Sequence, residues 1–159
     1  MSEDPYGTGT EPMVADVYAF RTFQVLDGRL ASIGAGVLDD NNGGWNNGMC
    51  EAYCRTNPEH QAPVRDCHCG VYGFYAIDHL LTQYPDQAVR IIAVITIRGR
   101  VLVDDKGLRA TAARVVAYWC AEDAVVEAAV CANDCPGARR FYDRDVMTRI
   151  CELTGQPPV

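Results

Sequence analysis

The sequence has almost no lysine and no apolar segment long enough to cross a membrane. Lys106 is the single lysine among fourteen basic residues, and the others are arginines. No apolar run approaches the roughly 20 residues that a membrane-spanning helix requires. The start, Met1-Ser2-Glu3-Asp4, is acidic and lacks the apolar segment of a secretory signal. We therefore expect a cytoplasmic protein without membrane partners.

Recognisable catalytic motifs are also missing. The chain has no phosphate-binding loop, dinucleotide fingerprint, serine elbow or H-E-x-x-H zinc motif. We therefore assign no catalytic residues, and an enzyme with a cysteine–histidine site is only an alternative. The net charge of −7 would repel duplex DNA unless arginines cluster locally. A nucleic-acid partner is therefore less favoured than a protein partner.

The composition suits a single folded domain. Apolar residues make up 48% of 159 residues, which is enough for a packed core. We predict a disordered acidic tail over residues 1–14 and one globular α+β domain over residues 15–155. Hairpin turns join its strands, so the sheet should be mainly antiparallel.

The expected strands form hairpins and a meander. Their ranges are 17–25, 30–37, 89–97, 100–104 and 108–118, with a helix over 109–119 as the alternative for the last. Asp27-Gly28 is a strong hairpin signal. We expect this hairpin and the meander to belong to one sheet.

Helices are expected over residues 72–84, 123–132 and 139–153, the last two forming a C-terminal helical pair within residues 120–153. Apolar side chains at helical spacing should face the core. They are Phe74, Ile77, Leu80 and Leu81 in the first helix, Val126, Ala129 and Val130 in the second, and Phe141, Val146, Ile150 and Leu153 in the third.

Cysteine, by contrast, is abundant: the chain has eight. In a reducing cytoplasm cysteines bind metal or remain free thiols more often than they form disulfides. Residues 50–70 form a cysteine-rich loop that carries little apolar content and needs something to order it. Its potential metal ligands are Cys50, Cys54, His60, Cys67, His68 and Cys69.

We predict that four of these residues bind one structural zinc ion: Cys54, His60, Cys67 and Cys69. Residues i and i+2 of an extended chain point to the same side, so Cys67 and Cys69 can offer both sulfurs to one ion. Gly70 allows a sharp turn, and a helix beginning near Val71 would lower the pKa of the thiols.

Other interpretations of the cysteines stay open. Cys50 or His68 could replace one of the chosen ligands. Four cysteines, Cys50, Cys54, Cys67 and Cys69, could hold an iron–sulfur cluster, or the thiols could simply be buried. The remaining cysteines could form a second metal site or lie in the core; they are Cys120, Cys131, Cys135 and Cys151.

Four arginines on the meander define a possible nucleic-acid face: Arg98, Arg100, Arg109 and Arg114. Arginines beside Tyr118 or Trp119 on a sheet could stack on bases. We nevertheless expect these arginines to be mostly solvated and paired singly with carboxylates. The wealth of arginine, alanine, valine and aspartate is typical of coding in a GC-rich genome such as that of an actinobacterium or its phage.

Several short motifs together resemble a group of small actinobacterial and mycobacteriophage proteins without an assigned activity. The motifs are Ala52-x-Cys54, His60-x-Ala62-Pro63, Cys67-x-Cys69-Gly70-Val71-Tyr72, Gly99-Arg100-Val101 and Gly107-Leu108-Arg109-Ala110. The resemblance covers about residues 17–118 and also includes the segment Tyr18–Leu30. It supports Cys54, His60, Cys67 and Cys69 as one unit. This chain differs from the pattern at Gly73, where alanine is usual, and at Arg98-Gly99, where a tryptophan–glycine pair is common.

Together these observations predict a zinc-stabilised, non-enzymatic accessory protein, encoded by a phage or an actinobacterium, that binds a host protein. A nucleic-acid-binding zinc module and an enzyme are the alternatives.

Overall fold

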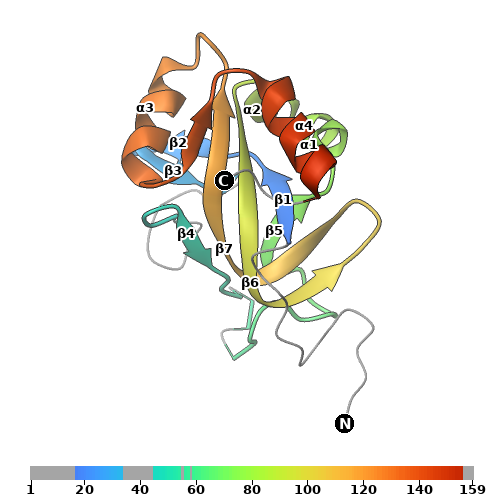
Figure 1. The fold of residues 1–159 in the computed structure, drawn as a ribbon. Helices are drawn as coiled ribbons and strands as arrows, with labels where there is room; N and C mark the ends of the chain where they lie inside the picture. Colours follow the sequence, from blue (N-terminus) through green and yellow to red (C-terminus); the bar gives the residue numbers. More distant parts are fainter. Residues whose placement is uncertain (1–16, 34–44, 55, 58, 156–159) are drawn as a thin grey trace.

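Two long strands form the centre of the molecule. In the computed structural model, which describes residues 17–33, 45–54, 56–57 and 59–155, β6 spans Ile91–Val103 and β7 spans Gly107–Cys120. They pair antiparallel from Ile91↔Cys120 to Val103↔Leu108 (Figure 1). β-Branched residues dominate β6, as suits a pleated, buried surface. The meander was predicted to break near residue 99, but the structure has a bulge within one continuous strand there. Residues 108–118 form a strand, as predicted, and not the alternative helix.

The other strands attach to this ribbon and close it into a ring. β1 (Tyr18–Arg21) pairs with β6, β5 (Val71–Phe74) pairs with β7, and β1 and β5 meet at Phe20↔Phe74. β4 (Met49–Glu51) and β8 (Arg139–Phe141) also pair with β7. The six-stranded sheet is antiparallel except at β8, which confirms the predicted single α+β domain.

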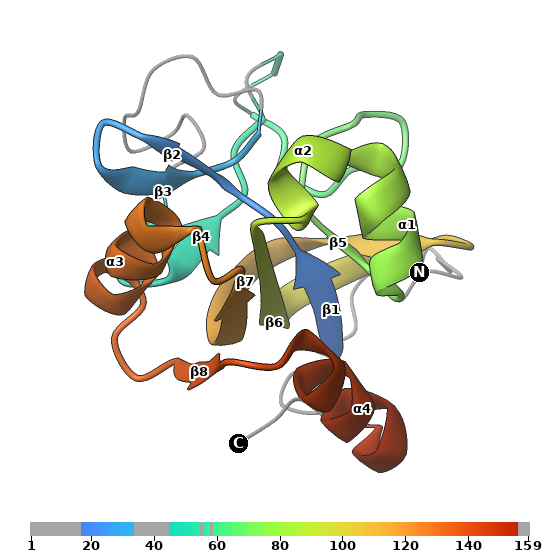
Figure 2. The ribbon, with the colours of Figure 1, turned by 90° about the horizontal axis from the view of Figure 1, so that it is seen from above.

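Helices and a small hairpin cover the two faces of this sheet (Figure 2). On one face lie α1 (Ile77–Gln83), α2 (Pro85–Ala88) and α4 (Arg144–Thr154), whose buried residues pack with those of β1 and β6. On the other face lie α3 (Val125–Asp134) and the hairpin of β2 (Gln24–Leu26) and β3 (Arg29–Ala31). β1 is buried on both sides, as its sequence indicated: Ala19 belongs to one core and Phe20 to the other.

The Asp27-Gly28 hairpin forms as predicted but belongs to a separate two-stranded sheet. Asp27 and Gly28 both have positive φ (53° and 74°), as a two-residue hairpin turn requires. The hydroxyl of Thr22 donates a hydrogen bond of 2.6 Å to the carbonyl of Ile91. This bond occupies the edge of β6 where β1 ends, and the chain leaves the sheet there. The second half of the predicted returning strand, residues 34–37, lies outside the described residues.

The first predicted helix begins too early. Residues 72–74 belong to strand β5, in which Val71 and Gly73 are buried and Tyr72 is exposed. That alternation is a strand pattern, and β5 is held between β7 and β1. Phe74, Ile77, Leu80 and Leu81 nevertheless all pack into the core, as expected.

The last predicted helix also begins too early, and this error changes which residues face the core. The carboxylate of Asp143 accepts hydrogen bonds from the N–H groups of Asp145 and Val146, so the helix starts at Arg144. Residues 139–141 form β8 instead. Of the four residues predicted to face the core, Phe141 and Ile150 do so, while Val146 and Leu153 are 46% and 79% exposed. Met147 and Cys151 are buried in α4 instead.

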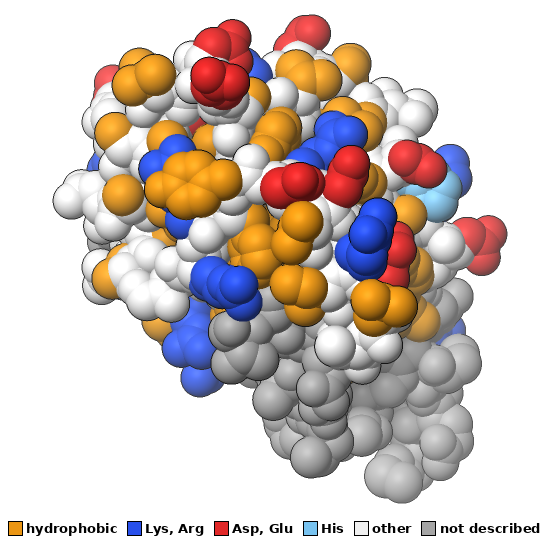
Figure 3. All heavy atoms as spheres, turned by 45° about the horizontal axis from the view of Figure 1, so that its top comes forward, with side chains coloured by type: hydrophobic (Ala, Val, Ile, Leu, Met, Phe, Trp, Pro, Cys, Tyr) orange, Lys and Arg blue, Asp and Glu red, His pale blue; other side chains and the backbone are white. Residues whose placement is uncertain are grey.

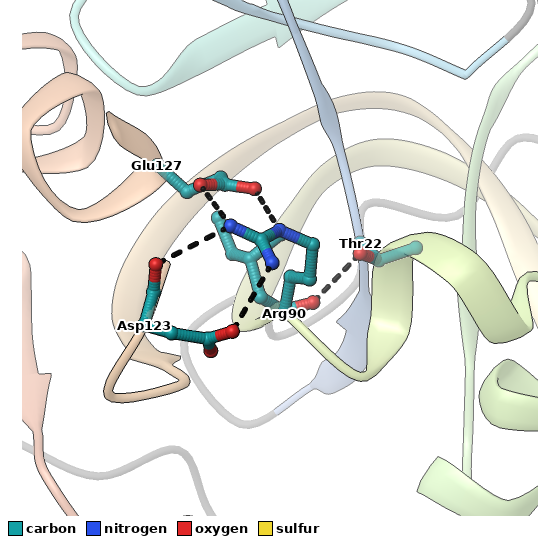
Figure 4. A network of polar contacts seen from close by, with 5 residues as sticks. Thr22, Arg90, Asp123 and Glu127 are labelled. Atoms are coloured by element: carbon teal, nitrogen blue, oxygen red, sulfur yellow. Dashed lines mark hydrogen bonds and ion pairs between the residues drawn. The ribbon is translucent and has the colours of Figure 1, made fainter. Parts of the chain in front are cut away.

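Helix α3 buries only one of the three residues predicted to face the core. Val130 is buried as predicted, together with Ala128 and Cys131, whereas Val126 and Ala129 are exposed. A bidentate ion pair connects this helix to the start of β6: Arg90 binds Glu127, with Nε and Oε2 2.5 Å apart, and more loosely Asp123 (Figure 4).

The acidic tail predicted over residues 1–14 lies outside the described residues. No helix in the described part of the chain is long and apolar enough to span a membrane.

Candidate metal centre

Three cysteines and one histidine of the loop between β4 and β5 come together at one point. One possible ligand atom from each of Cys54, His60, Cys67 and Cys69 lies within 4.8 Å of all the others. The sulfurs of Cys54 and Cys67 are 3.5 Å apart. Figure 1 shows the loop (teal to green) at the end of the β6–β7 ribbon opposite α3 and α4.

The geometry and chemistry of this cluster fit a zinc ion. Zinc with Zn–S bonds of about 2.3 Å places the sulfurs of a tetrahedron about 3.8 Å apart. The observed separations therefore need only small adjustments to share one ion. Nδ1 of His60 is buried and has no hydrogen-bond partner, so the imidazole has coordinating capacity that no protein group uses. Cys54 is buried and the other three residues are half-buried.

Hydrogen bonds to sulfur favour the thiolate form in the cluster. A hydrogen bond from the backbone of Cys69, then one from the side chain of Cys54, lowers the pKa of Cys67 to about 7. The N–H of Asn57 donates a 3.3 Å hydrogen bond to the sulfur of Cys54. Burial raises the pKa of Cys69. The loop thus holds one easily ionised thiol beside one that favours its proton.

The helix expected beside the thiols is absent, because β5 begins at Val71. Hydrogen bonds, rather than a helix dipole, therefore lower the pKa of Cys67. Gly70 does mark a backbone conformation that favours glycine, with a φ of 131°. A Cβ at this position would lie 3.0 Å from Cβ of Arg109 and 3.2 Å from Cβ of Pro63, so the glycine also makes room for its neighbours.

The alternate ligands do not join the cluster. Cys50 lies in β4 opposite Ala113, and its thiol approaches the carbonyl of Glu51 at 3.8 Å. His68 is exposed, and only its carbonyl is engaged, by the hydroxyl of Tyr72 at 2.6 Å. The four-cysteine set required for the iron–sulfur alternative is therefore not assembled.

The remaining four cysteines are buried in the apolar cores. Cys120, Cys131 and Cys135 lie on the α3 face of the sheet, and Cys151 lies on the α4 face. Within the described residues, no second group of metal-binding side chains comes together. These cysteines are core thiols in the structure.

The prediction for the four arginines is wrong for two of them. Arg100 and Arg109 donate hydrogen bonds to backbone carbonyls of the cysteine loop, not to carboxylates. Arg98 and Arg114 are exposed, and no ion pair of either occurs within the described residues. The four arginines therefore do not form one exposed nucleic-acid face, because the guanidinium groups of Arg100 and Arg109 bind the loop. These contacts were not predicted from the sequence. The one available indication was that the motifs containing Arg100 and Arg109 occur together with the C-x-C-G motif in the resembling proteins.

The fold and this cluster define a single α+β domain with a Cys3His group able to hold a metal such as zinc. Comparisons with protein-family models, curated proteins and solved structures found no match.

Proposed function

We propose that this chain is a non-enzymatic accessory protein, stabilised by zinc at Cys54, His60, Cys67 and Cys69, that acts by binding another protein. The observation that carries the proposal is the four-ligand cluster. Four protein ligands complete a tetrahedral zinc site and leave no position for a substrate, which is typical of structural rather than catalytic zinc. The proposal places the protein in the cytoplasm, where its thiols stay reduced.

The motif resemblance supports an origin in an actinobacterium or its phage and a host protein as partner. The motifs that carry the resemblance are far apart in the sequence but adjacent in space. Tyr72 of the C-x-C-G-V-Y segment pairs with Arg109 of the G-x-R-A segment, and Arg100 reaches Pro63. Their meeting around one cluster supports treating them as parts of a single functional unit.

The helical end presents arginine–aromatic pairs of a kind that is common at protein interfaces. Guanidinium groups stack on aromatic rings there: Arg139 lies 4.3 Å from the ring centre of Phe141, and Arg140 lies 4.4 Å from that of Tyr142. Tyr142 is 78% exposed. Figure 3, with the top of Figure 1 turned forward, shows basic, acidic and apolar side chains intermixed at this end. Tyrosine and arginine are the residues that most often dominate binding energy at interfaces.

Two measurements test the proposal. Elemental analysis of protein purified without added metal should find zinc in equal proportion to the chain, and no zinc would overturn the metal assignment. Capture from a mycobacterial lysate should then be compared between the natural chain and Arg140→Glu/Tyr142→Ala. A protein retained only by the natural chain supports the proposal. Equal retention by both, or capture of single-stranded nucleic acid instead, contradicts it.

A further inference from the structure

The side chain of Arg109 faces four backbone carbonyls of the cysteine loop. Nη1 donates to the carbonyls of Val64 and Cys69, each at 2.9 Å, and also to that of Cys67. Nη2 donates to the carbonyl of Arg65 at 3.2 Å. Two of these carbonyls belong to residues whose thiols are in the cluster. One guanidinium thus links the segment on which Cys67 and Cys69 lie.

The position of Arg109 is fixed by the sheet and by a glycine. Arg109 lies opposite Tyr72 of β5 and Leu102 of β6, so its backbone is paired on both sides. A Cβ at Gly70 would lie 3.0 Å from Cβ and 3.5 Å from Cγ of Arg109, too close to its aliphatic stem. The glycine that follows the C-x-C pair therefore allows the arginine to pass close beneath the loop.

A second arginine reaches the same loop from the neighbouring strand. The β6–β7 register shifts between Arg98 and Val101, and Gly99 within this bulge has a φ of 76°. Bulges commonly redirect side chains. The N–H of Arg100 donates to the hydroxyl of Thr111 at 3.0 Å, and its Nη2 donates to the carbonyl of Pro63 at 2.5 Å. The bulge thus directs Arg100 toward the beginning of the ligand-bearing segment.

We infer that Arg109, assisted by Arg100, is a positioning residue of the metal centre that holds the cysteine loop in its ligand-binding conformation before the ion arrives. This inference rests on the proposed metal-binding function. Ordering the loop in advance lowers the entropy lost when metal binds. The guanidinium charge also lies beside a site where three thiolates and one zinc ion leave a net negative charge.

The test measures zinc affinity, by competition with a chromophoric chelator, in the natural chain, Arg109→Gln, Arg109→Lys and Arg114→Gln. Arg114 is the control because it lies exposed on the same strand. Loss of a residue that orients metal ligands typically weakens binding about 10–100-fold, and we expect this for Arg109→Gln. Arg114→Gln should bind as the natural chain does. Equal affinity of Arg109→Gln and Arg114→Gln would overturn the inference.

The variant Arg109→Lys distinguishes the effect of hydrogen-bond geometry from the effect of charge. It also provides the test if Arg109→Gln does not fold. Lysine keeps the charge but cannot reach four carbonyls with a planar fork, so we expect it to restore less than half of the lost binding on a logarithmic scale. Full restoration would show that charge alone matters and would refute positioning. The absorption of bound Co²⁺ adds a geometric readout: a broadened tetrahedral spectrum in Arg109→Lys supports the inference, and an unchanged one opposes it. Absence of metal from the natural chain would instead refute the proposed function.

Discussion

Cys67 in the cysteine loop, and Cys135 and Cys151 in the core, show how two regions of the molecule treat the same side chain in opposite ways. In the loop, hydrogen bonds lower the pKa of Cys67 to about 7. In the core, burial raises the pKa of Cys135 to about 12 and that of Cys151 to about 11. Cys67 therefore favours a thiolate that can bind metal, whereas Cys135 and Cys151 favour neutral thiols that pack as small apolar groups.

The two regions also differ in what holds them together. The core consists of apolar side chains on both faces of β6, from Ile91 to Ile95, all of which are buried. The loop is held by hydrogen bonds from Arg100 and Arg109 to its carbonyls and by the meeting of its thiols. The loop depends on polar contacts, and it brings together side chains able to hold a metal, because it has little apolar surface to bury.

The largest expected effect comes from exchanging one cysteine in each region. Cys67→Ser should lose the bound zinc, since structural zinc contributes an apparent binding free energy of about 10–16 kcal/mol in small zinc domains and depends on its full ligand set. Cys135→Ser should keep the metal, because its thiol is buried in the core and does not belong to the ligand cluster. Elemental analysis of both variants measures the difference. If Cys67→Ser retains the metal, or if Cys135→Ser loses it, the prediction that only the loop cysteines bind metal is wrong.

Glycine substitutions test the packing of the sheet independently of the loop. A Cβ at Gly107 would lie 2.1 Å from the carbonyl oxygen of Gly73, a backbone atom that cannot easily move. Gly107→Ala should lower the free energy of unfolding by about 1–3 kcal/mol or more. Gly28→Ala is the control: nothing lies within 4 Å of its Cβ, and only its positive φ is strained. Urea unfolding of both compares them, and an equal loss would show that the sheet relieves the crowding at Gly107 by shifting.

The sequence was sufficient for the features that depend on local pattern. The β-branched run in β6, the Asp27-Gly28 hairpin and the C-x-C spacing each determine a local geometry, and each is present in the structure. The choice of Cys54 and His60 as the other ligands also agrees with the group that the fold brings together.

The features that could not be predicted depend on contacts distant in sequence. Residues 72–74 form a strand because β7 and β1 pair with them, while their apolar spacing is compatible with a helix as well. Thr22 separates the hairpin from the main sheet through a bond to Ile91, 69 residues away. Arg109 binds carbonyls, which every residue possesses, so no residue type in the loop identifies its partner.

A third test uses pH to separate the two kinds of thiol in metal-free protein. With a pKa of about 7 instead of 9.0, Cys67 has about 50-fold more thiolate at pH 7 than an ordinary cysteine. Iodoacetamide should therefore label Cys67 at a rate that rises through pH 7, while Cys135 and Cys151 react only after unfolding. Labelled positions are identified by mass spectrometry of peptides. A rate for Cys67 that rises only near pH 9 would contradict the assigned hydrogen bonds.

The same shifts predict opposite effects on folding stability. The pKa of Cys67 is lowered, so its thiolate stabilises the fold fully above pH 9 and this contribution is lost as pH falls through about 7. The pKa values of Cys135 and Cys151 are raised, so the core is fully stable below pH 9 and loses stability as pH rises toward 11 to 12. Thermal unfolding across this range should lose the first dependence in Cys67→Ala and show a weaker second dependence in Cys135→Ala, where Cys151 still contributes.

The smallest expected effect concerns the ion pair of the core region. Glu127→Gln should lower the free energy of unfolding by only about 0.2–1 kcal/mol, the usual contribution of a partly exposed pair. A hydrogen bond from Arg90 lowers the pKa of Glu127, so the pair contributes fully above pH 4.5 and its contribution is lost as pH falls through the lowered pKa. The natural chain and the variant should therefore converge in acid, and Asp123→Asn, at a looser 3.7 Å contact, should change less still. If Glu127→Gln cost as much as Gly107→Ala, polar contacts would hold the core as they hold the loop, and the two regions would no longer differ in kind.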